Sequence, residues 1–172
     1  GAQPVRPRLG LRDAFVAAYR PLHLRDDLRR LPAIVRHWSV WGPVLVAVIS
    51  TILPVLLGSG NDIARLLFSI FVSPGAVAGV FIAGYFAPTA AYLAGFVVAV
   101  GSSILFSVFA WGLAQGLMSE GSADLTAEAL SGSILTAFFI GPLYGIFLGA
   151  TAAWYKRFLA RSEEHTSELQ SH

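Results

Sequence analysis

The sequence predicts an all-α, polytopic membrane protein: a bundle of four transmembrane helices with proline kinks, preceded by a basic, amphipathic, cytoplasmic segment. Three observations predict this class. The 172-residue chain is 55% hydrophobic and 13% charged, with a mean hydropathy of +0.66, whereas soluble domains carry about 25% charged residues. Four apolar stretches reach the roughly 20 residues that a helix needs to cross a bilayer. Basic residues gather on one predicted side of the membrane.

Residues 11–37 are predicted to form the basic amphipathic segment. Leu24, Leu28 and Leu31 recur at helical spacing, and arginines and aspartates occupy the other sides. Two interpretations are open: a helix lying on the cytoplasmic leaflet with its arginines against anionic head groups, or an irregular positive flank, because Pro21 and Pro32 shorten any regular helix. The predicted membrane-surface residues are Arg25, Arg29, Arg30 and Arg36, together with Lys156 and Arg157 near the other end of the chain.

Residues 38–160 are predicted to form the transmembrane domain, with spans at about residues 38–58, 66–86, 89–114 and 133–155. No Asp, Glu, Lys, Arg or His lies inside any span. The second and third spans nearly merge, and as one helix they would be about 73 Å long, more than twice the hydrocarbon thickness. Pro88 is therefore expected to end the second span in a hairpin turn. Asn61 or Asp62 is expected to cap the start of the second span.

The basic residues predict the orientation. Eight arginines precede Trp38, and Lys156 and Arg157 follow the fourth span, whereas the loop before that span contains three acidic residues and no basic one. Because basic residues mark cytoplasmic loops, both termini are predicted to be cytoplasmic. The Arg-, Ala-, Gly- and Pro-rich composition indicates a bacterial cell membrane, the inner one. Aromatic belts are expected from Trp38, Trp41, Trp154 and Tyr155 on the inner side and from Trp111 on the outer side.

Small residues repeat at four-residue spacing in two spans, as Gly75, Gly79 and Ala83 and as Gly141, Gly145 and Gly149. Residues four apart share a helix face, and a face without bulky side chains lets another backbone approach closely. We expect these residues to pack helices within the bundle. The alternative is a docking face for a second copy, forming a homo-oligomer, or for a membrane-protein partner.

Prolines lie in the middle of three predicted spans, at Pro54, Pro74 and Pro142, where each is expected to kink its helix. We expect static kinks; the alternative is a set of hinges or broken helices that line a substrate site, as in transporters. Each proline frees a carbonyl group in its helix, and nearby hydroxyls are expected to bond these carbonyls. The hydroxyls are those of Ser50, Thr51, Ser73 and Thr136.

The spans lack the residues that most membrane chemistry needs. Ion-coupled carriers place Asp, Glu or His in the membrane, and hydrolysis needs a nucleophile with a base, or a metal ion with its ligands. Ser102, Ser103 and Ser107 have no His within the spans, the chain contains no Cys, and His37 is interpreted as an interfacial flank of the first span. The sequence therefore predicts no catalytic residue, no cofactor, no metal site and no nucleic-acid partner.

Two classes of function stay open. We expect a non-enzymatic, small membrane protein that acts through helix packing or partner contact, with the lipid bilayer and its anionic cytoplasmic head groups as its surroundings. The alternative is a transporter, or a channel subunit, for a neutral solute. A polar groove through the bundle would favour transport, and a sealed apolar centre would favour the packing function.

Both ends of the chain are expected to be atypical. Residues 1–10, GAQPVRPRLG, are typical of a proline-rich, disordered linker remnant. Residues 161–172, RSEEHTSELQSH, match the in-frame translation of a common sequencing adapter and are interpreted as read-through that is not native. They are expected to lie exposed, as coil or as an isolated helical turn. Removing these residues takes one Arg from the 12 basic residues and three Glu from the 10 acidic residues. The remaining 11 basic and 7 acidic residues change the formal net charge from +2 to +4.

We predict that a cysteine introduced at Ala18 is labelled from the cytoplasmic side, and that one introduced at Ser122 is labelled from the outside. The chain has no native Cys, so each variant carries a single thiol. The measurement is labelling of intact cells and of inverted membrane vesicles with a membrane-impermeant maleimide. Labelling of Ala18→Cys in intact cells would overturn the predicted orientation.

Overall fold

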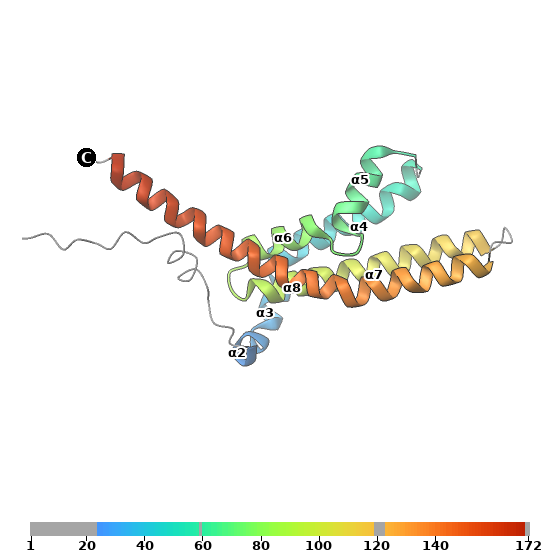
Figure 1. The fold of residues 1–172 in the computed structure, drawn as a ribbon, viewed down its shortest axis with the longest axis horizontal. Helices are drawn as coiled ribbons and strands as arrows, with labels where there is room; N and C mark the ends of the chain where they lie inside the picture. The colour runs from blue at the N-terminus through green and yellow to red at the C-terminus, as the bar shows by residue number, and fades with distance from the viewer. Residues whose placement is uncertain (1–23, 59, 119–122, 171–172) are drawn as a thin grey trace, which may run out of the picture.

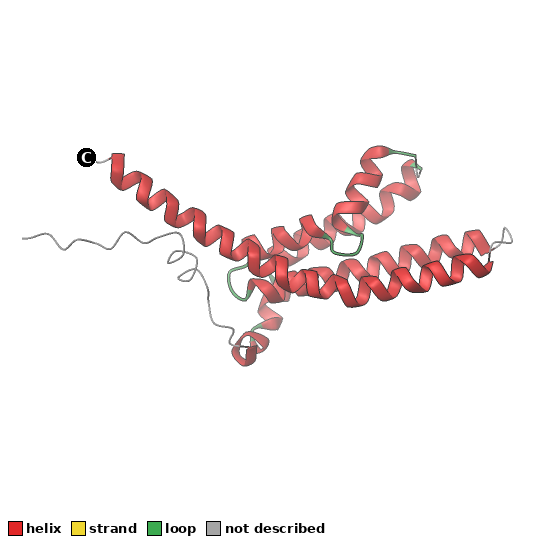
Figure 2. Cartoon of the chain, in the orientation of Figure 1, coloured by secondary structure: helices red, strands yellow, loops and turns green. Residues whose placement is uncertain are grey.

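The computed structural model describes the backbone of residues 24–58, 60–118 and 123–170, and the side chains of these residues except 114, 116–118, 123–129 and 161–170. The expectations for residues 1–10 and for the first half of segment 11–37 lie outside the described residues. The described part of the chain forms helices and contains no strand (Figure 2). In chain order the helices are α2 (Leu24–Arg29), α3 (Leu31–Arg36), α4 (Trp38–Leu57), α5 (Asp62–Phe71), α6 (Val77–Phe86), α7 (Ala91–Met118) and α8 (Ala123–Gln170).

Three long apolar helices indicate a membrane protein. Stretches Trp38–Leu57 of α4, Ala91–Leu113 of α7 and Leu130–Ala160 of α8 are long and apolar enough to cross a membrane. At most 39% of the most apolar window in any of them is buried inside the protein, so most of their apolar side chains face outward. Along α8, for example, an exposed face carries Leu135, Phe139, Leu143 and Phe147.

The helices form two arms that meet at one end (Figure 1). One arm consists of α4 and α5, the other of α7 and α8, and α6 lies where they meet. We call the joined end the closed half and the diverging end the open half. The buried core lies in the closed half and consists mainly of small or β-branched side chains of α6 and of the first turns of α7, including Val80, Ala83, Ala94 and Val98.

The second predicted span, residues 66–86, is not one helix, because it is divided between α5 and α6. The break follows from three consecutive residues. Pro74 has no backbone N–H, and Gly75 (φ 104°) and Ala76 (φ 32°) have left-handed backbone that a right-handed helix cannot include. Pro74 therefore lies in a break and not at a kink, whereas Pro54 and Pro142 lie inside α4 and α8.

Helices α7 and α8 approach each other closely at glycines in the closed half. A Cβ atom added to Gly145 would lie 2.7 Å from the carbonyl oxygen of Gly95 and 2.6 Å from the Cβ atom of Ala99. A Cβ atom added to Gly149 would lie 2.6 Å from the carbonyl oxygen of Ala91. Only a residue without a side chain fits at these two positions, so the backbones of α7 and α8 pack directly against each other.

Helix α6 joins the same contact. A Cβ atom added to Gly84 would lie 2.6 Å from the carbonyl oxygen of Gly149. We call Gly84, Gly95, Gly145 and Gly149 the glycine seam. Gly79 is buried, and a Cβ atom added to it would lie at ordinary contact distance from α4 and α7. Gly75, at the break, is also buried, but a Cβ atom added to it would meet no atom within 4 Å.

The described part of the basic segment forms two short helices that pack against the closed half. Pro32 follows the division between α2 and α3 and lies in the first turn of α3, where proline is tolerated. Ile34 is buried in the core, and Leu31 packs against it. Leu24 and Leu28 of the predicted apolar face remain exposed. The segment is therefore docked on the bundle through α3, and its α2 leucines face outward.

The expectation that residues 161–172 form coil or an isolated turn is wrong for residues 161–170, because α8 continues through them to Gln170. These ten residues contain no Pro and no Gly, so nothing in their backbone ends the helix. This end of α8 extends away from the other helices (Figure 1). The interpretation of the segment as read-through stays a prediction.

We predict that Gly145→Leu destabilises the protein by about 1–3 kcal/mol or more, because a side chain there overlaps Gly95 and Ala99 of α7. Phe147→Trp is the matched control, since Phe147 lies on the same helix with 69% of its surface exposed. Thermal unfolding of both variants in detergent measures the difference. Equal stability of the two variants would show that the glycine seam is not a packing interface.

Candidate functional site

The open half contains a groove of about 880 Å³ between α4, α5 and α7. This volume lies within the roughly 300–1,000 Å³ typical of ligand pockets. Two exposed valines, one from α4 and one from α7, form its edges, so the groove opens onto the surface of the bundle. The lining residues are Thr51, Ile52, Pro54 and Val55 of α4, Arg65 and Phe68 of α5, and Val108, Phe109, Gly112 and Leu113 of α7.

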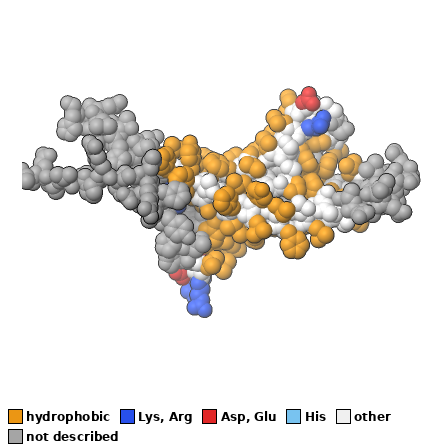
Figure 3. All heavy atoms as spheres, in the orientation of Figure 1, with side chains coloured by type: hydrophobic (Ala, Val, Ile, Leu, Met, Phe, Trp, Pro, Cys, Tyr) orange, Lys and Arg blue, Asp and Glu red, His pale blue; other side chains and the backbone are white. Residues whose placement is uncertain are grey.

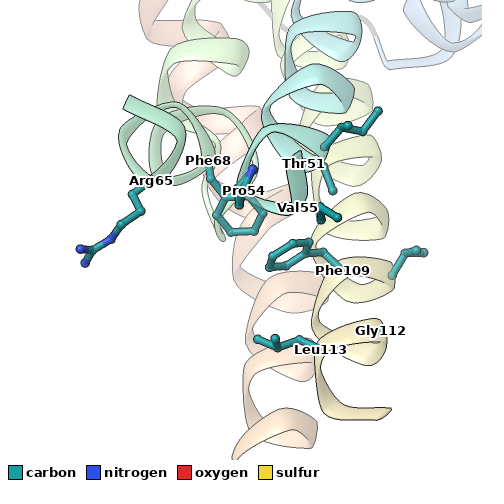
Figure 4. Close-up of a pocket in the computed structure, with 10 residues that line it drawn as sticks. Thr51, Pro54, Val55, Arg65, Phe68, Phe109, Gly112 and Leu113 are labelled. Carbon is teal, nitrogen blue, oxygen red and sulfur yellow. The ribbon is translucent and has the colours of Figure 1, made fainter. Parts of the chain in front are cut away.

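An aromatic contact forms the base of this groove. The ring centroids of Phe68 in α5 and Phe109 in α7 lie 4.7 Å apart at an interplanar angle of 48°. Figure 4 shows Phe68 next to Pro54 of α4. The contact joins α5 to α7 at this level.

The lining is apolar except for two side chains. Thr51 donates its hydroxyl to the carbonyl oxygen of Ala47 in its own helix at 2.8 Å, so this hydroxyl is not available to a ligand as a donor. Arg65 lies near the start of α5, and its guanidinium group extends away from the other lining residues (Figure 4). No hydrogen bond or ion pair joins this guanidinium group to another described residue. The groove therefore suits an apolar ligand, with one cation at its edge.

The break between α5 and α6 lies next to the groove and is held by a buried hydroxyl. Ser102 of α7, 2% exposed, donates to the carbonyl oxygen of Phe71 at 3.0 Å. Phe71 ends α5, and the last carbonyls of a helix have no partner in that helix. The backbone N–H groups of Val72 and Ser73 both donate to the carbonyl of Phe68. Together these bonds satisfy several of the backbone groups that the break leaves without a partner inside a helix.

A second serine of α7 connects it to α8. The hydroxyl of Ser103 lies 2.8 Å from the carbonyl oxygen of Ala137 in α8 and 2.9 Å from that of Ala99 in its own helix. A Cβ atom added to Gly141 would lie 2.7 Å from this hydroxyl oxygen. Gly141 therefore leaves the space in which Ser103 reaches α8.

The hydroxyls expected to bond the carbonyls freed by prolines bond other carbonyls. Ser50 donates to the carbonyl of Val46 at 2.7 Å, whereas the carbonyl freed by Pro54 is that of Ser50 itself, four residues before the proline. The other three hydroxyls likewise donate four residues back in the chain. A serine or threonine in a helix reaches this carbonyl most easily, because its side chain points toward the preceding turn.

The predicted membrane-surface residues lie on α2, α3 and α8. Arg25, Arg29, Arg30, Arg36 and Lys156 are exposed, and Arg157 is half-buried. The ammonium group of Lys156 lies 5.8 Å from the ring centroid of Tyr85 at the end of α6. Asp62 and Arg65 lie at the opposite end, at the start of α5. The surface between these two charged ends is mainly hydrophobic in the view of Figure 3.

Aromatic side chains gather at the closed half. Trp38 lies 5.1 Å from Phe86, and Tyr155 lies 6.3 Å from Phe81, measured between ring centroids. His37 caps α4, since its Nδ1 accepts from the backbone N–H of Ser39 at 3.2 Å. At the other end, Asn61 caps α5, because its side-chain oxygen accepts from the N–H groups of Ile63 and Ala64, each at 3.1 Å.

Two polar contacts were not expected from the sequence. Tyr92 of α7 donates its hydroxyl to Asp27 of α2 at 2.9 Å, and Asp27 is only 9% exposed. From the sequence, Asp27 was predicted to lie on the charged face of the amphipathic segment. The contact between Ser102 and the carbonyl of Phe71 was not expected either. The sequence does contain a signal for it, because Ser102 lies in the middle of an apolar span, where a buried hydroxyl needs an acceptor.

No protein-family model, no curated protein and no solved structure matches the chain. Among the described residues, no group of three or more His, Cys, Asp and Glu lies close enough together to hold a metal ion. The groove, the break between α5 and α6 and the charges at the two ends of the bundle are the features that bear on function.

We predict that Ser102→Ala destabilises the protein by about 0.5–2 kcal/mol, because the carbonyl of Phe71 loses its donor at a buried position. Ser107→Ala is the control, since Ser107 donates to the carbonyl of Ser103 within its own helix, which that helix already bonds. Unfolding in detergent and hydrogen exchange at residues 72–76 measure the effect. Similar behaviour of the two variants would contradict a role of Ser102 at the break.

Proposed function

We propose that the chain is a non-enzymatic integral membrane protein that holds an apolar partner from the bilayer in the groove between α4, α5 and α7. It crosses the membrane four times, with both ends in the cytoplasm. The observation that carries this proposal is an apolar groove in a bundle whose surface is itself largely apolar. A ligand that reaches this groove comes from the lipid phase.

The number of crossings is supported by the lengths of α5 and α6. Each has ten residues and is about 15 Å long. Joined across the break, they cover about 30 Å, which is the thickness of the hydrocarbon core. The pair therefore provides the second crossing, and the break lies near the middle of the membrane. With four crossings, α2 and α3 lie on the same side as Lys156 and Arg157, in agreement with the rule that basic residues remain cytoplasmic.

The surroundings of α2 support contact with anionic head groups. Arg25 and Arg29 are exposed beside the exposed Leu24 and Leu28. Leucines that enter the head-group region and arginines that bind phosphate are typical of interfacial segments. The hydrogen bond between Tyr92 and Asp27 fixes α2 to the bundle at this level.

Partner contact is favoured over chemistry by the nature of the lining. None of the described lining residues carries a carboxylate, imidazole or thiol, and the hydroxyl of Thr51 is bonded within α4. General acid–base or nucleophilic catalysis needs such groups within reach of a substrate.

One observation favours the alternative, transport of a neutral solute. The second crossing is broken near the middle of the membrane, and discontinuous helices form substrate sites in several transporter folds. The apolar lining of the groove argues against a polar solute. Equilibration of glycerol across proteoliposomes faster than across protein-free vesicles would favour transport.

We predict that benzoylphenylalanine at Val108 gives a discrete photo-adduct in intact cells, because Val108 lines the groove and is 67% exposed. The control position is Phe147 on α8, which is 69% exposed and does not line the groove. Intact-mass analysis of the purified protein measures the adduct and detects lipid and protein partners alike. The same distribution of adducts at both positions would contradict a specific partner in the groove.

A further inference from the structure

We propose that the groove binds an acyl chain of an anionic phospholipid of the outer leaflet, and that the guanidinium group of Arg65 binds the lipid phosphate. This inference rests on the proposed function, since it identifies the apolar partner by its chemistry. It adds a ligand class, a leaflet and a residue that selects the head group.

The size of the groove favours an acyl chain over a helix. A helix is about 10 Å across, and a volume of 880 Å³ holds only about two turns of it. The lining covers residues 51–55 of α4 and 108–113 of α7, which is about one and a half turns of each. A transmembrane partner helix packs over more turns than that, whereas a flexible hydrocarbon chain fills a short groove of this kind.

The charge at the edge favours an anionic head group. Among the described lining residues Arg65 alone is charged. It is exposed, and its guanidinium group, which extends outward from the groove (Figure 4), has no partner among the described residues. Guanidinium binds phosphate through paired hydrogen bonds. Asp62, one turn earlier, is exposed but does not line the groove, so its charge lies beside the site and not within it.

The position of Arg65 along the membrane fits a lipid head group. Asn61 caps α5, and Arg65 lies about 6 Å further along the helix. A long arginine side chain at this depth places its charge at the interface while its methylene groups stay among apolar neighbours. The phosphate would therefore lie at the membrane surface beside α5, and the acyl chain would lie along the apolar lining of α4 and α7.

The glycine at position 112 provides a way to fill the groove without disturbing the fold. A Cβ atom added to Gly112 meets no atom within 4 Å, and Gly112 is a lining residue. Gly132 of α8 also has open space at its Cβ position but does not line the groove. Gly112→Leu and Gly132→Leu therefore form a matched pair.

The experiment is native mass spectrometry of the delipidated full chain in a neutral detergent. It is titrated with dioleoylphosphatidylglycerol and, separately, with dioleoylphosphatidylcholine, which has the same acyl chains. We expect one phosphatidylglycerol to bind first and more tightly than phosphatidylcholine. Arg65→Gln is expected to weaken phosphatidylglycerol binding about fivefold and leave phosphatidylcholine binding unchanged, whereas Arg65→Lys keeps the preference. Gly112→Leu is expected to weaken binding of both lipids about tenfold, since it displaces methylene groups of the chain.

Three results would overturn the inference. Equal effects of Arg65→Gln and of Arg36→Gln, which removes an exposed arginine of α3, would mean that the head-group preference comes from general charge. Equal effects of Gly112→Leu and Gly132→Leu would mean that lipid does not enter the groove. A change from dimer to monomer in Gly112→Leu, without a change in lipid binding, would mean that a second copy occupies it.

A further arm separates a lipid site from a simple anion site. Glycerol 3-phosphate carries the phosphate without the acyl chain, and its failure to displace phosphatidylglycerol supports the inference, whereas displacement would overturn it. Failure of the inference leaves the proposed function testable by the photo-adduct at Val108. Failure of the predicted topology would instead leave lipid binding in detergent intact and change only the leaflet.

Discussion

Close contact between the backbones of α7 and α8 is the constraint on which the rest of the structure depends. Apolar side chains gain little by meeting each other in lipid, so helices there associate through tight packing and hydrogen bonds. At Gly95, Gly145 and Gly149 the two backbones approach to distances that no Cβ atom permits. Gly84 brings α6 into the same contact. The helices of the closed half are therefore held together through backbone and small residues.

The open half follows from the division of residues 66–86 between α5 and α6. The predicted continuous helix over residues 66–86 does not form. The break at Pro74, Gly75 and Ala76 divides it, and α5 leaves with α4 as a separate arm. The groove lies where this arm separates from α7, above the contact between Phe68 and Phe109. The groove lies beside this break. The break also needs the hydroxyl of Ser102, because the end of α5 leaves carbonyl groups that lipid cannot bond.

Polar residues inside this bundle serve structure in each case where a partner is visible. Ser102 bonds a helix end, Ser103 joins α7 to α8, and Tyr92 holds Asp27 of the basic segment. Arg65 differs from them, because it lines the groove and has no partner among the described residues. This contrast is the physical reason for assigning it to a ligand.

The sequence by itself determined the helical, apolar class of protein, the positions of three long apolar helices, the turn at Pro88 and a cap of α5 at Asn61 or Asp62. The structure assigns the cap to Asn61. These features depend on composition, apolar length and local backbone chemistry, which are properties of neighbouring residues. The sequence also contained the glycine and proline patterns, but not their consequences. Pro74 alone is compatible with a kink, and the left-handed backbone of Gly75 and Ala76 is what divides the helix. The groove, the burial of Asp27 and the separation of the arms were decided by the tertiary structure, because each requires residues distant in the chain to meet.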